Sequence, residues 1–350
     1  MEFVPLDARL HLPGGKFSYM LQDWAQSLSV EHAFAKTCGV LERILGIGLC
    51  VDSLEQMSRD MASNVAAFRQ SRPAPAPQEE GQILVATADN KGIPMRRPAD
   101  HLPLGARRKK GEKANKKQMA AVGGVYTVDP KPRTPEELVA LLFRENAPAV
   151  DRASPEPVAQ HKRFYSSLSL EHDGQIIRGE ASVFAWMEQE VVRRHRPGQP
   201  VVCLMDGQKT LWDMAQTHFD CLEHVEILDL LHAMSRIWEA AHVFHAEGSD
   251  AASNFARERC LRLLRGEAVY VIAGLRQMAT KHKLRGAKLQ RLRSTCNYLE
   301  NNVHRMRYDE YLAAGYPIAS GVIEGACRYV VKDRMRSEEH TSELQSRQSI

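Results

Sequence analysis

Three acidic residues follow or flank apolar segments that the sequence predicts to be buried. Asp89 follows the apolar run 83–88, and Asp206 follows the apolar run 200–205. Because ligands of open α/β sheets bind beyond the strand ends, we expect these two carboxylates to meet there. Glu324 lies at the border of the apolar stripe of an expected helix near the C-terminus. Packing of that stripe on the sheet would aim Glu324 at the same strand ends.

Three carboxylates in one place predict divalent metal ions. Mutual repulsion would raise their pKa values unless cations offset it. Mg²⁺ binds oxygen ligands and keeps positions for water and phosphate oxygens, and two such ions about 4 Å apart promote phosphodiester displacement. Three carboxylates that met would therefore suit two Mg²⁺ or Mn²⁺ ions, and Asp89, Asp206 and Glu324 are the candidate ligands. Taken singly, each acid also fits a turn, a helix cap or a surface charge, since Asp-Gly after a strand is a common turn.

Three stretches carry a resemblance to a known family. They read ADNKGIPM at residues 88–95, MDGQ at 205–208 and GYPIASGVIEGACR at 315–328. In this order they resemble the three acidic motifs of ISKra-type insertion-sequence transposases. The resemblance implies a DDE enzyme with a ribonuclease-H-like fold, whose catalytic and metal-binding residues are Asp89, Asp206 and Glu324. Asn90 stands where the family pattern has glycine, a departure that leaves the ligand itself unchanged.

The same resemblance extends in weaker form across residues 5–335 and implies two auxiliary residues. Asp229 and His232 match the Asp-x-x-His motif that related DDE families carry after the second aspartate. A helix histidine near a buried strand is also commonly a satisfied core group, so both interpretations of His232 stay open.

A basic segment separates the expected strands 83–88 and 119–128. Its density of positive charge favours contact with DNA phosphates, whereas a solvated surface loop is the ordinary alternative. The cations are Arg96, Arg97, Arg107, Arg108, Lys109, Lys110, Lys113, Lys116 and Lys117.

The first 70 residues predict helices. Ser29 is expected to cap a helix that ends at Gly46, and a second helix should start after Asp52 or Ser53 and continue to Phe68. A helix, a glycine-bearing turn and a helix outline a helix-turn-helix, although a helical hairpin that only packs fits equally well.

Strand and helix patterns alternate after this region. We expect strands at 83–88, 119–128, 200–205 and 225–228, and helices at 134–148, 181–195 and 232–245. Ser320 should cap the helix of Glu324. The long interval between Asp206 and Glu324, with helical patterns up to residue 311, predicts an all-α insertion. The expected fold class is α/β: a ribonuclease-H-like mixed sheet with helices, an all-α insertion and an N-terminal helical region.

These patterns divide the chain into six segments. They are a helical, candidate helix-turn-helix region at 1–71, a Pro/Ala linker at 72–80, the catalytic core at 81–231, the helical insertion at 232–312, the catalytic helix at 313–335 and a tail at 336–350. The tail begins with RSEEHTSELQS, which is one translated frame of a common sequencing adapter. We expect the natural coding sequence to end near Met335, and deletion of residues 337–350 to leave the melting temperature unchanged.

Composition narrows the class of protein. The chain has 350 residues, 43% of them hydrophobic, and a net charge of +4, so we expect a folded protein of more than one domain. Its seven scattered cysteines, without a Cys-x-x-Cys pair, argue against a disulfide framework and a zinc ribbon. The first residues do not read as a signal peptide and no apolar run is long enough to span a bilayer. We therefore expect a cytoplasmic protein, nucleoid-associated when bound to DNA, without a membrane partner.

The sequence therefore predicts a DNA transposase fragment that nicks transposon ends and transfers the resulting 3′-OH to target DNA. Its partner would be double-stranded DNA, with the protein acting as a homo-oligomer. Two alternatives stay open: a ribonuclease-H-like nuclease that does not join strands, and a non-catalytic DNA-binding regulator.

Overall fold

The computed structural model describes residues 16–94, 117–145, 156–172 and 175–332. Residues 96–116, which hold most of the basic segment, and the tail 336–350 lie outside this part of the chain. Lys117 is the first residue of a strand. The chain divides into two units, with the boundary between Ala74 and Pro75.

The N-terminal unit contains four helices. They are α2 (Tyr19–Glu31), α3 (Phe34–Leu45), α4 (Val51–Ala62) and α5 (Val65–Ser71). Helices α2, α3 and α4 share a small core made of Ala25, Leu41, Leu54 and Met57.

The expected helix boundaries in this unit are partly wrong. Ser29 does not cap a helix; it lies inside α2, where its hydroxyl donates to the carbonyl of Ala25 at 2.7 Å. Helix α3 ends at Gly46, as expected, because a φ of 65° suits glycine. The second expected helix is split in two, since α4 ends at Ala62 and α5 begins at Val65.

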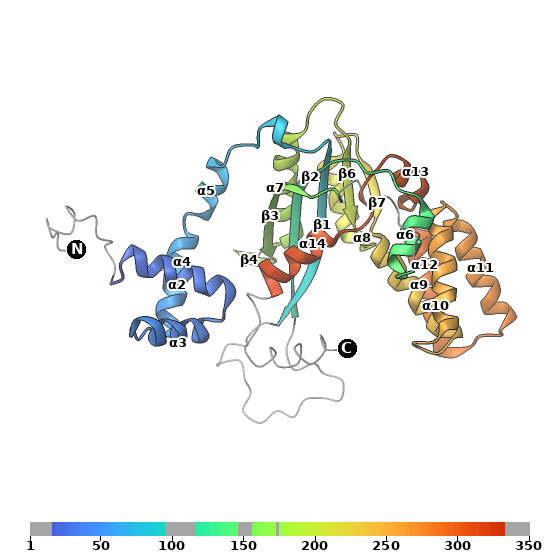
Figure 1. Ribbon diagram of the computed structural model, residues 1–350, viewed down its shortest axis with the longest axis horizontal. Helices are drawn as coiled ribbons and strands as arrows, with labels where there is room; N and C mark the ends of the chain where they lie inside the picture. The colour runs from blue at the N-terminus through green and yellow to red at the C-terminus, as the bar shows by residue number, and fades with distance from the viewer. Residues whose placement is uncertain (1–15, 95–116, 146–155, 173–174, 333–350) are drawn as a thin grey trace, which may run out of the picture. The chain divides into compact units, whose positions relative to one another are not determined.

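A five-stranded mixed sheet forms the core of the second unit (Figure 1). Its strand order is β3-β2-β1-β6-β7, with antiparallel pairing of β1 with β2 and of β2 with β3, and parallel pairing of β1 with β6 and of β6 with β7. The strands are β1 (Ile83–Pro94), β2 (Lys117–Val128), β3 (Gln160–Leu168), β6 (Val201–Met205) and β7 (Val225–Leu228). The short strands β4 (Leu170–His172) and β5 (Gln175–Ile177) pair only with each other. The α/β class with a mixed sheet is therefore confirmed.

Strand β1 is longer than the sequence predicts. We expected it to end before Asp89, yet it continues to Pro94. The reason is its partner: β2 pairs with it along the whole length, from Ile83 opposite Val128 to Pro94 opposite Lys117. Strands β3, β4 and β5 were not predicted; in β3 the polar side chains of residues 160–163 hide any apolar alternation, and β4 and β5 have only three residues each.

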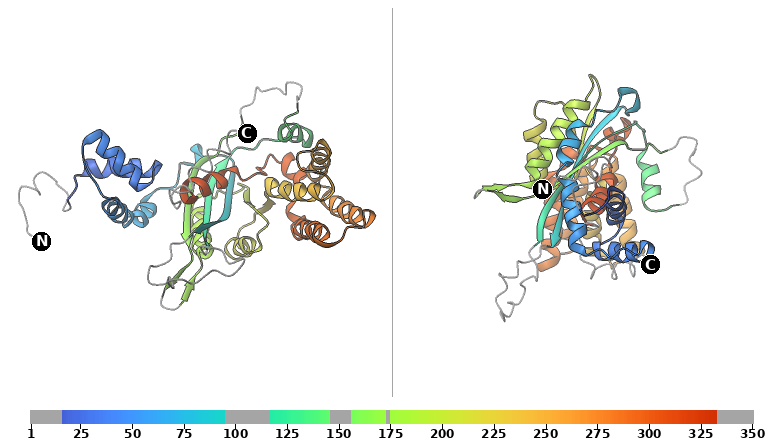
Figure 2. Two further views of the ribbon diagram at one scale, coloured as in Figure 1. Left: turned by 90° about the horizontal axis from the view of Figure 1, so that it is seen from below. Right: turned by 90° about the vertical axis from the view of Figure 1, so that its left-hand side faces the viewer.

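Two helices, α7 (Gly179–Arg194) and α8 (Lys209–Phe219), cover one face of the sheet (Figure 2). Alternate residues of β1, beginning with Leu84, point to this face and pack with Phe184 and Met187 of α7. Helix α7 approaches β2 closely at Gly123, where an added Cβ would lie 2.5 Å from the side chain of Val183.

The other face of the sheet carries the remaining helices. Residues Ile83 and Val85 pack with α9 (Leu230–Phe244), and Ile93 packs with α14 (Gly321–Ala326) and the π-helix Cys327–Lys332 that follows it. Between α9 and α14 the chain forms α10 (Asp250–Leu264), α11 (Ala268–Lys281), α12 (Gly286–Asn301), the 3-10 turn Val303–Arg305 and α13 (Tyr308–Ala313). Helix α6 (Pro135–Leu142) packs on α10, and a 3-10 turn spans Pro77–Glu79 before β1. Among the described residues, none of these helices has the length and apolar character required to cross a membrane.

Candidate functional site

The register of the parallel strands places Asp89 and Asp206 at the same height. Ala86 of β1 pairs with Cys203 of β6. Asp89 and Asp206 each lie three residues further along, so they leave the paired region together. Their charges interact, because the Asp89 carboxylate contributes to a raised pKa of Asp206.

Strand β7 adds a third aspartate to this row. Met205 pairs with Leu228, and the next residue on each strand is an aspartate, Asp206 and Asp229. The N–H of Asp229 still donates to the carbonyl of Met205 at 2.8 Å. The carboxyl-terminal ends of β6 and β7 and the corresponding height of β1 therefore carry three neighbouring aspartates, where ligands of open α/β sheets bind.

Burial and the other aspartates make Asp206 harder to ionise. Burial is the largest cause of its raised pKa, and the charges of Asp89 and Asp229 raise it further. The N–H of Gln208, which donates to Asp206 Oδ1 at 2.9 Å, and the side chain of His232 act in the opposite direction. A nearby cation would stabilise the ionised form, as expected of a metal ligand.

Asp229 is fully buried and already has a full set of hydrogen-bond donors. It caps α9: its Oδ1 accepts the N–H groups of Leu231 at 2.6 Å and His232 at 3.3 Å. Its Oδ2 accepts the N–H of Ser320 at 2.8 Å and also the Ser320 hydroxyl. Four donors saturate the lone pairs of a carboxylate. Asp229 thus holds the starts of α9 and α14 together and has little capacity left for a metal ion.

The predicted role of the Ser320 side chain is wrong. Ser320 is the residue before α14, but its side chain makes no capping hydrogen bond to that helix. Its hydroxyl donates to the buried Asp229 carboxylate instead, and hydrogen bonds to an ionised acceptor are stronger than those between neutral groups.

His232 lies among the acids on the first turn of α9. Its Nδ1 is 3.7 Å from Asp229 Oδ1, a distance typical of an ion pair and too long for a hydrogen bond. The Asp229 carboxylate is the main cause of a raised pKa of His232, and Asp206 and Asp89 contribute to it. Among the described residues Nδ1 is buried without a hydrogen-bond partner, while the side chain as a whole is 37% exposed.

Glu324 reaches the same place from α14. One ligand atom each from Glu324, Asp229 and His232 lie within 4.8 Å of one another, so this group could hold a metal ion. Because hydrogen bonds already occupy both oxygens of Asp229, the side chains of this group that remain free to bind a metal ion are Glu324 and His232. Helix α14 is also linked to β1, since the thiol of Cys327 donates to Asp89 Oδ2 at 3.3 Å.

A tyrosine from the helical block, which is the set of helices α10 to α13 between α9 and α14, supports the loop that follows Asp206. The hydroxyl of Tyr298 on α12 accepts the N–H of Gly207 at 3.0 Å, and an added Cβ at Gly207 would lie 2.4 Å from the ring. The guanidinium of Arg236 lies 4.7 Å from the ring centroid, and burial raises the pKa of Tyr298 to about 12. No motif in the sequence marks Tyr298, and Gly207 was interpreted only as a turn residue.

The structure therefore brings the five expected site residues of the core to one end of the sheet. They come from the middle of β1, the residues after β6 and β7, the first turn of α9, and α14: Asp89, Asp206, Asp229, His232 and Glu324. The basic segment, apart from Lys117 in β2, falls outside the described residues.

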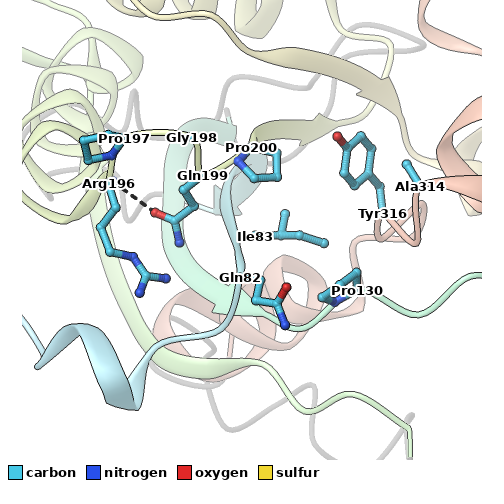
Figure 3. A pocket seen from close by; sticks show the side chains of 10 residues that line it. All are labelled: Gln82, Ile83, Pro130, Arg196, Pro197, Gly198, Gln199, Pro200, Ala314 and Tyr316. Carbon is cyan, nitrogen blue, oxygen red and sulfur yellow. Dashed lines mark hydrogen bonds between the residues drawn. The ribbon is translucent and has the colours of Figure 1, made fainter.

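A pocket of about 470 Å³ lies at the opposite end of β1 and β6 (Figure 3). Ile83 and Pro200 line it, with Tyr316 facing them across the space. Its polar groups already serve the fold: Gln199 accepts the N–H of Arg196 at 3.2 Å, and both side chains donate to the carbonyl of Gly81. This pocket contains none of the acidic site residues.

No protein-family model matches the chain, and a search of curated proteins found no match either.

Proposed function

We propose that the chain is a DDE transposase, which nicks DNA at transposon ends and joins the 3′-OH to target DNA as a homo-oligomer. The observation that carries the proposal is that the charges of Asp89 and Asp206 act on His232, which itself lies within metal-binding distance of Glu324. Such a set of carboxylates fits two Mg²⁺ or Mn²⁺ ions, because hard divalent cations take oxygen ligands and offset the repulsion among the acids.

In this proposal the site residues have three different roles. Asp89, Asp206 and Glu324 hold the ions, which would activate the attacking oxygen and stabilise the leaving oxygen. Asp229 positions the other groups, because its oxygens are occupied by backbone donors and by Ser320. His232 faces the acids with a free Nδ1 and a partly exposed ring, which places it to contact a phosphate or to transfer a proton.

The fold supports the proposal without being specific to it. A mixed sheet with three antiparallel strands and two further parallel strands is compatible with a ribonuclease-H-like core. The helical block between α9 and α14 agrees with the expected insertion, and the N-terminal helices with the candidate helix-turn-helix region. Double-stranded DNA is the proposed partner of that region and of the basic segment.

The decisive experiment compares nicking and joining in one series. The substrates are a supercoiled plasmid carrying the DNA that flanks the coding region, and the same ends pre-cleaved to a 3′-OH. We expect both reactions to require Mg²⁺ or Mn²⁺ and to be lost in Asp89→Asn. The matched control is Asp220→Asn, which alters an exposed aspartate at the end of α8.

Each rival function has its own outcome in this series. Metal-dependent nicking without joining of pre-cleaved ends would identify a nuclease. DNA binding without nicking, unchanged by Asp89→Asn, would identify a regulator and overturn the catalytic proposal.

A further inference from the structure

One long segment of the helical block contains no acidic residue. Between Glu267 and Glu300 the chain has neither Asp nor Glu, and this interval includes all of α11, the turn after it and most of α12. In the whole chain, by contrast, acidic residues are about as frequent as basic ones, with 43 against 47. The helical hairpin α11–α12 is thus locally cationic although the protein is nearly neutral.

Six cations lie between the last residue of α11 and the middle of α12, and we call them the basic tip. All six are exposed, and within the described residues none of them forms an ion pair. They are Lys281, Lys283, Arg285, Lys288, Arg291 and Arg293.

The other cations of the helical block behave differently. Every Arg and Lys between residues 246 and 311 outside the basic tip has a carboxylate within ion-pair distance. Arg276, which lies five residues before the basic tip, pairs with Glu300 at 2.6 Å. The seven paired residues are Arg257, Arg259, Arg262, Arg265, Arg276, Arg305 and Arg307. The surface therefore neutralises its cations everywhere in this block except at the tip.

The side chains around the tip determine which polyanion fits. No large apolar side chain is exposed between residues 271 and 328 in the described chain, so the tip has nothing to insert into a lipid layer. Residues 271–297 contain no Phe, Tyr or Trp, so the tip offers no platform on which unpaired bases stack. What remains is a set of long flexible cations, which suit the phosphates of a double helix.

We propose that the basic tip is a DNA-contacting surface of the helical block, which binds the phosphate backbone of duplex DNA without reading its sequence. The choice of DNA as the polyanion rests on the proposed function; the surface itself rests on the unpaired charges. Contacts of this kind position a protein on a duplex and carry no base specificity.

Salt dependence of binding to a short random-sequence duplex tests this surface in the full chain. The tip variant combines Lys281→Gln, Lys283→Gln, Arg285→Gln and Lys288→Gln. The matched control removes the same charge from the same helical block, with Arg257→Gln, Arg262→Gln, Arg265→Gln and Arg276→Gln. Between about 50 and 200 mM salt, the tip variant should bind more weakly, with a slope of log K against log salt shallower by about 0.9 for each lost phosphate contact. The control variant should keep the slope of the unmodified protein.

Two further measurements secure the interpretation. The melting temperature of the tip variant should not fall, because the replaced side chains are exposed and unpaired. The smaller variant Lys288→Gln with Arg291→Gln should shift the slope in the same direction.

Equal slopes for the tip and control variants would overturn the proposal, and so would an effect confined to anionic lipid vesicles or single-stranded DNA. Binding is measured in EDTA, where no metal-dependent nicking occurs, so a failure of the protein to nick DNA leaves this test intact.

Discussion

The N–H of Ser320 donates to Oδ2 of Asp229 at 2.8 Å, and this bond joins two segments that are 91 residues apart. A second bond lies beside it, from the N–H of Leu230 to the carbonyl of Ile318 at 2.9 Å. Together they fix the start of α14 against the start of α9. Because Glu324 lies on α14 and His232 on α9, the distance between these two side chains depends on the Asp229–Ser320 contact.

Removal of the Ser320 hydroxyl should therefore destabilise the protein. Ser320→Ala deletes one donor to a buried carboxylate, and hydrogen bonds to charged groups contribute about 1.5–3 kcal/mol. We expect a loss of that size in the free energy of unfolding, measured by denaturant titration. Ser294→Ala, which changes an exposed serine on α12, is the control and should shift it by less than about 0.5 kcal/mol. Equal effects of the two substitutions would show that the contact contributes nothing.

Metal binding should separate the ligands from the positioning residue. Mg²⁺ or Mn²⁺ is expected to raise the melting temperature of the unmodified protein, because binding to the folded state alone stabilises it. Asp89→Asn, Asp206→Asn and Glu324→Gln should each reduce this increase, with Glu310→Gln as an exposed control on α13.

Asp229→Asn should give a different pattern from the three ligand variants. Its amide nitrogen would face donors that now approach a carboxylate, so the variant should be destabilised before any metal is added. If Asp229→Asn instead kept full metal-free stability and lost only the metal effect, Asp229 would be a ligand.

The site should also make the metal-free protein less stable as the pH rises. The raised pKa of Asp206 means that the folded state holds this proton more tightly than the unfolded chain. Its contribution is therefore present below the ordinary value of 3.8 and is lost as the pH rises through the higher folded value. The raised pKa of His232 acts in the same direction in a second window, which begins near its ordinary value of 6.5.

Melting temperatures measured in EDTA across these two windows test the assignment. Asp206→Asn should flatten the lower window, and His232→Gln the upper one. Saturating Mg²⁺ should flatten the Asp206 window as well, because a cation removes the cost of ionisation. An unchanged pH profile in both variants would contradict the electrostatic coupling of the site.

The sequence predicted the part of the site that depends on strand ends and missed the part that depends on tertiary contacts. The segments before Asp206 and Asp229 are short and mostly apolar, so both strands were recognised, and the register then places the two acids side by side. Nothing local marks Tyr298, because its partner Gly207 is 91 residues away. The bond of Ser320 to Asp229 was hidden for the same reason, since helix capping is a local rule and the competing acceptor is distant.

The fold shows the same division between local and distant causes. Two strands with mostly apolar residues, 200–205 and 225–228, were predicted within one residue of their observed bounds. Strand β1 was predicted too short, because its second half is held in the sheet by pairing with β2 and not by its own apolar pattern. In the N-terminal unit, the break between α2 and α3 at residues 32–33 was not predicted, because these residues include no Gly or Pro.

The contact of Gly207 with Tyr298 predicts how a substitution beside Asp206 will affect the stability of the protein. An added Cβ at Gly207 would lie 2.4 Å from the tyrosine ring, so Gly207→Ala must displace the ring from the loop that follows Asp206. Overpacking of this kind costs about 1–3 kcal/mol. In a Tyr298→Ala background the same substitution meets no ring and should cost much less. A double-mutant cycle, measured by denaturant unfolding, should therefore give a coupling energy of about 0.5–3 kcal/mol.

Gly274→Ala on α11 supplies the control for this cycle. An added Cβ there meets nothing within 4 Å, so the substitution should be neutral, or stabilising by up to about 1 kcal/mol through helix propensity, in both backgrounds. Displacement of the ring should also break the hydrogen bond of 3.0 Å that the Tyr298 hydroxyl accepts from the Gly207 N–H. The position of Asp206, the preceding residue, would then be less firmly fixed. Gly207→Ala is then expected to weaken the Mg²⁺-dependent rise in melting temperature, whereas Gly274→Ala leaves it unchanged. Additive costs in the cycle, together with an undiminished metal effect, would show that α12 only covers the site and does not position it.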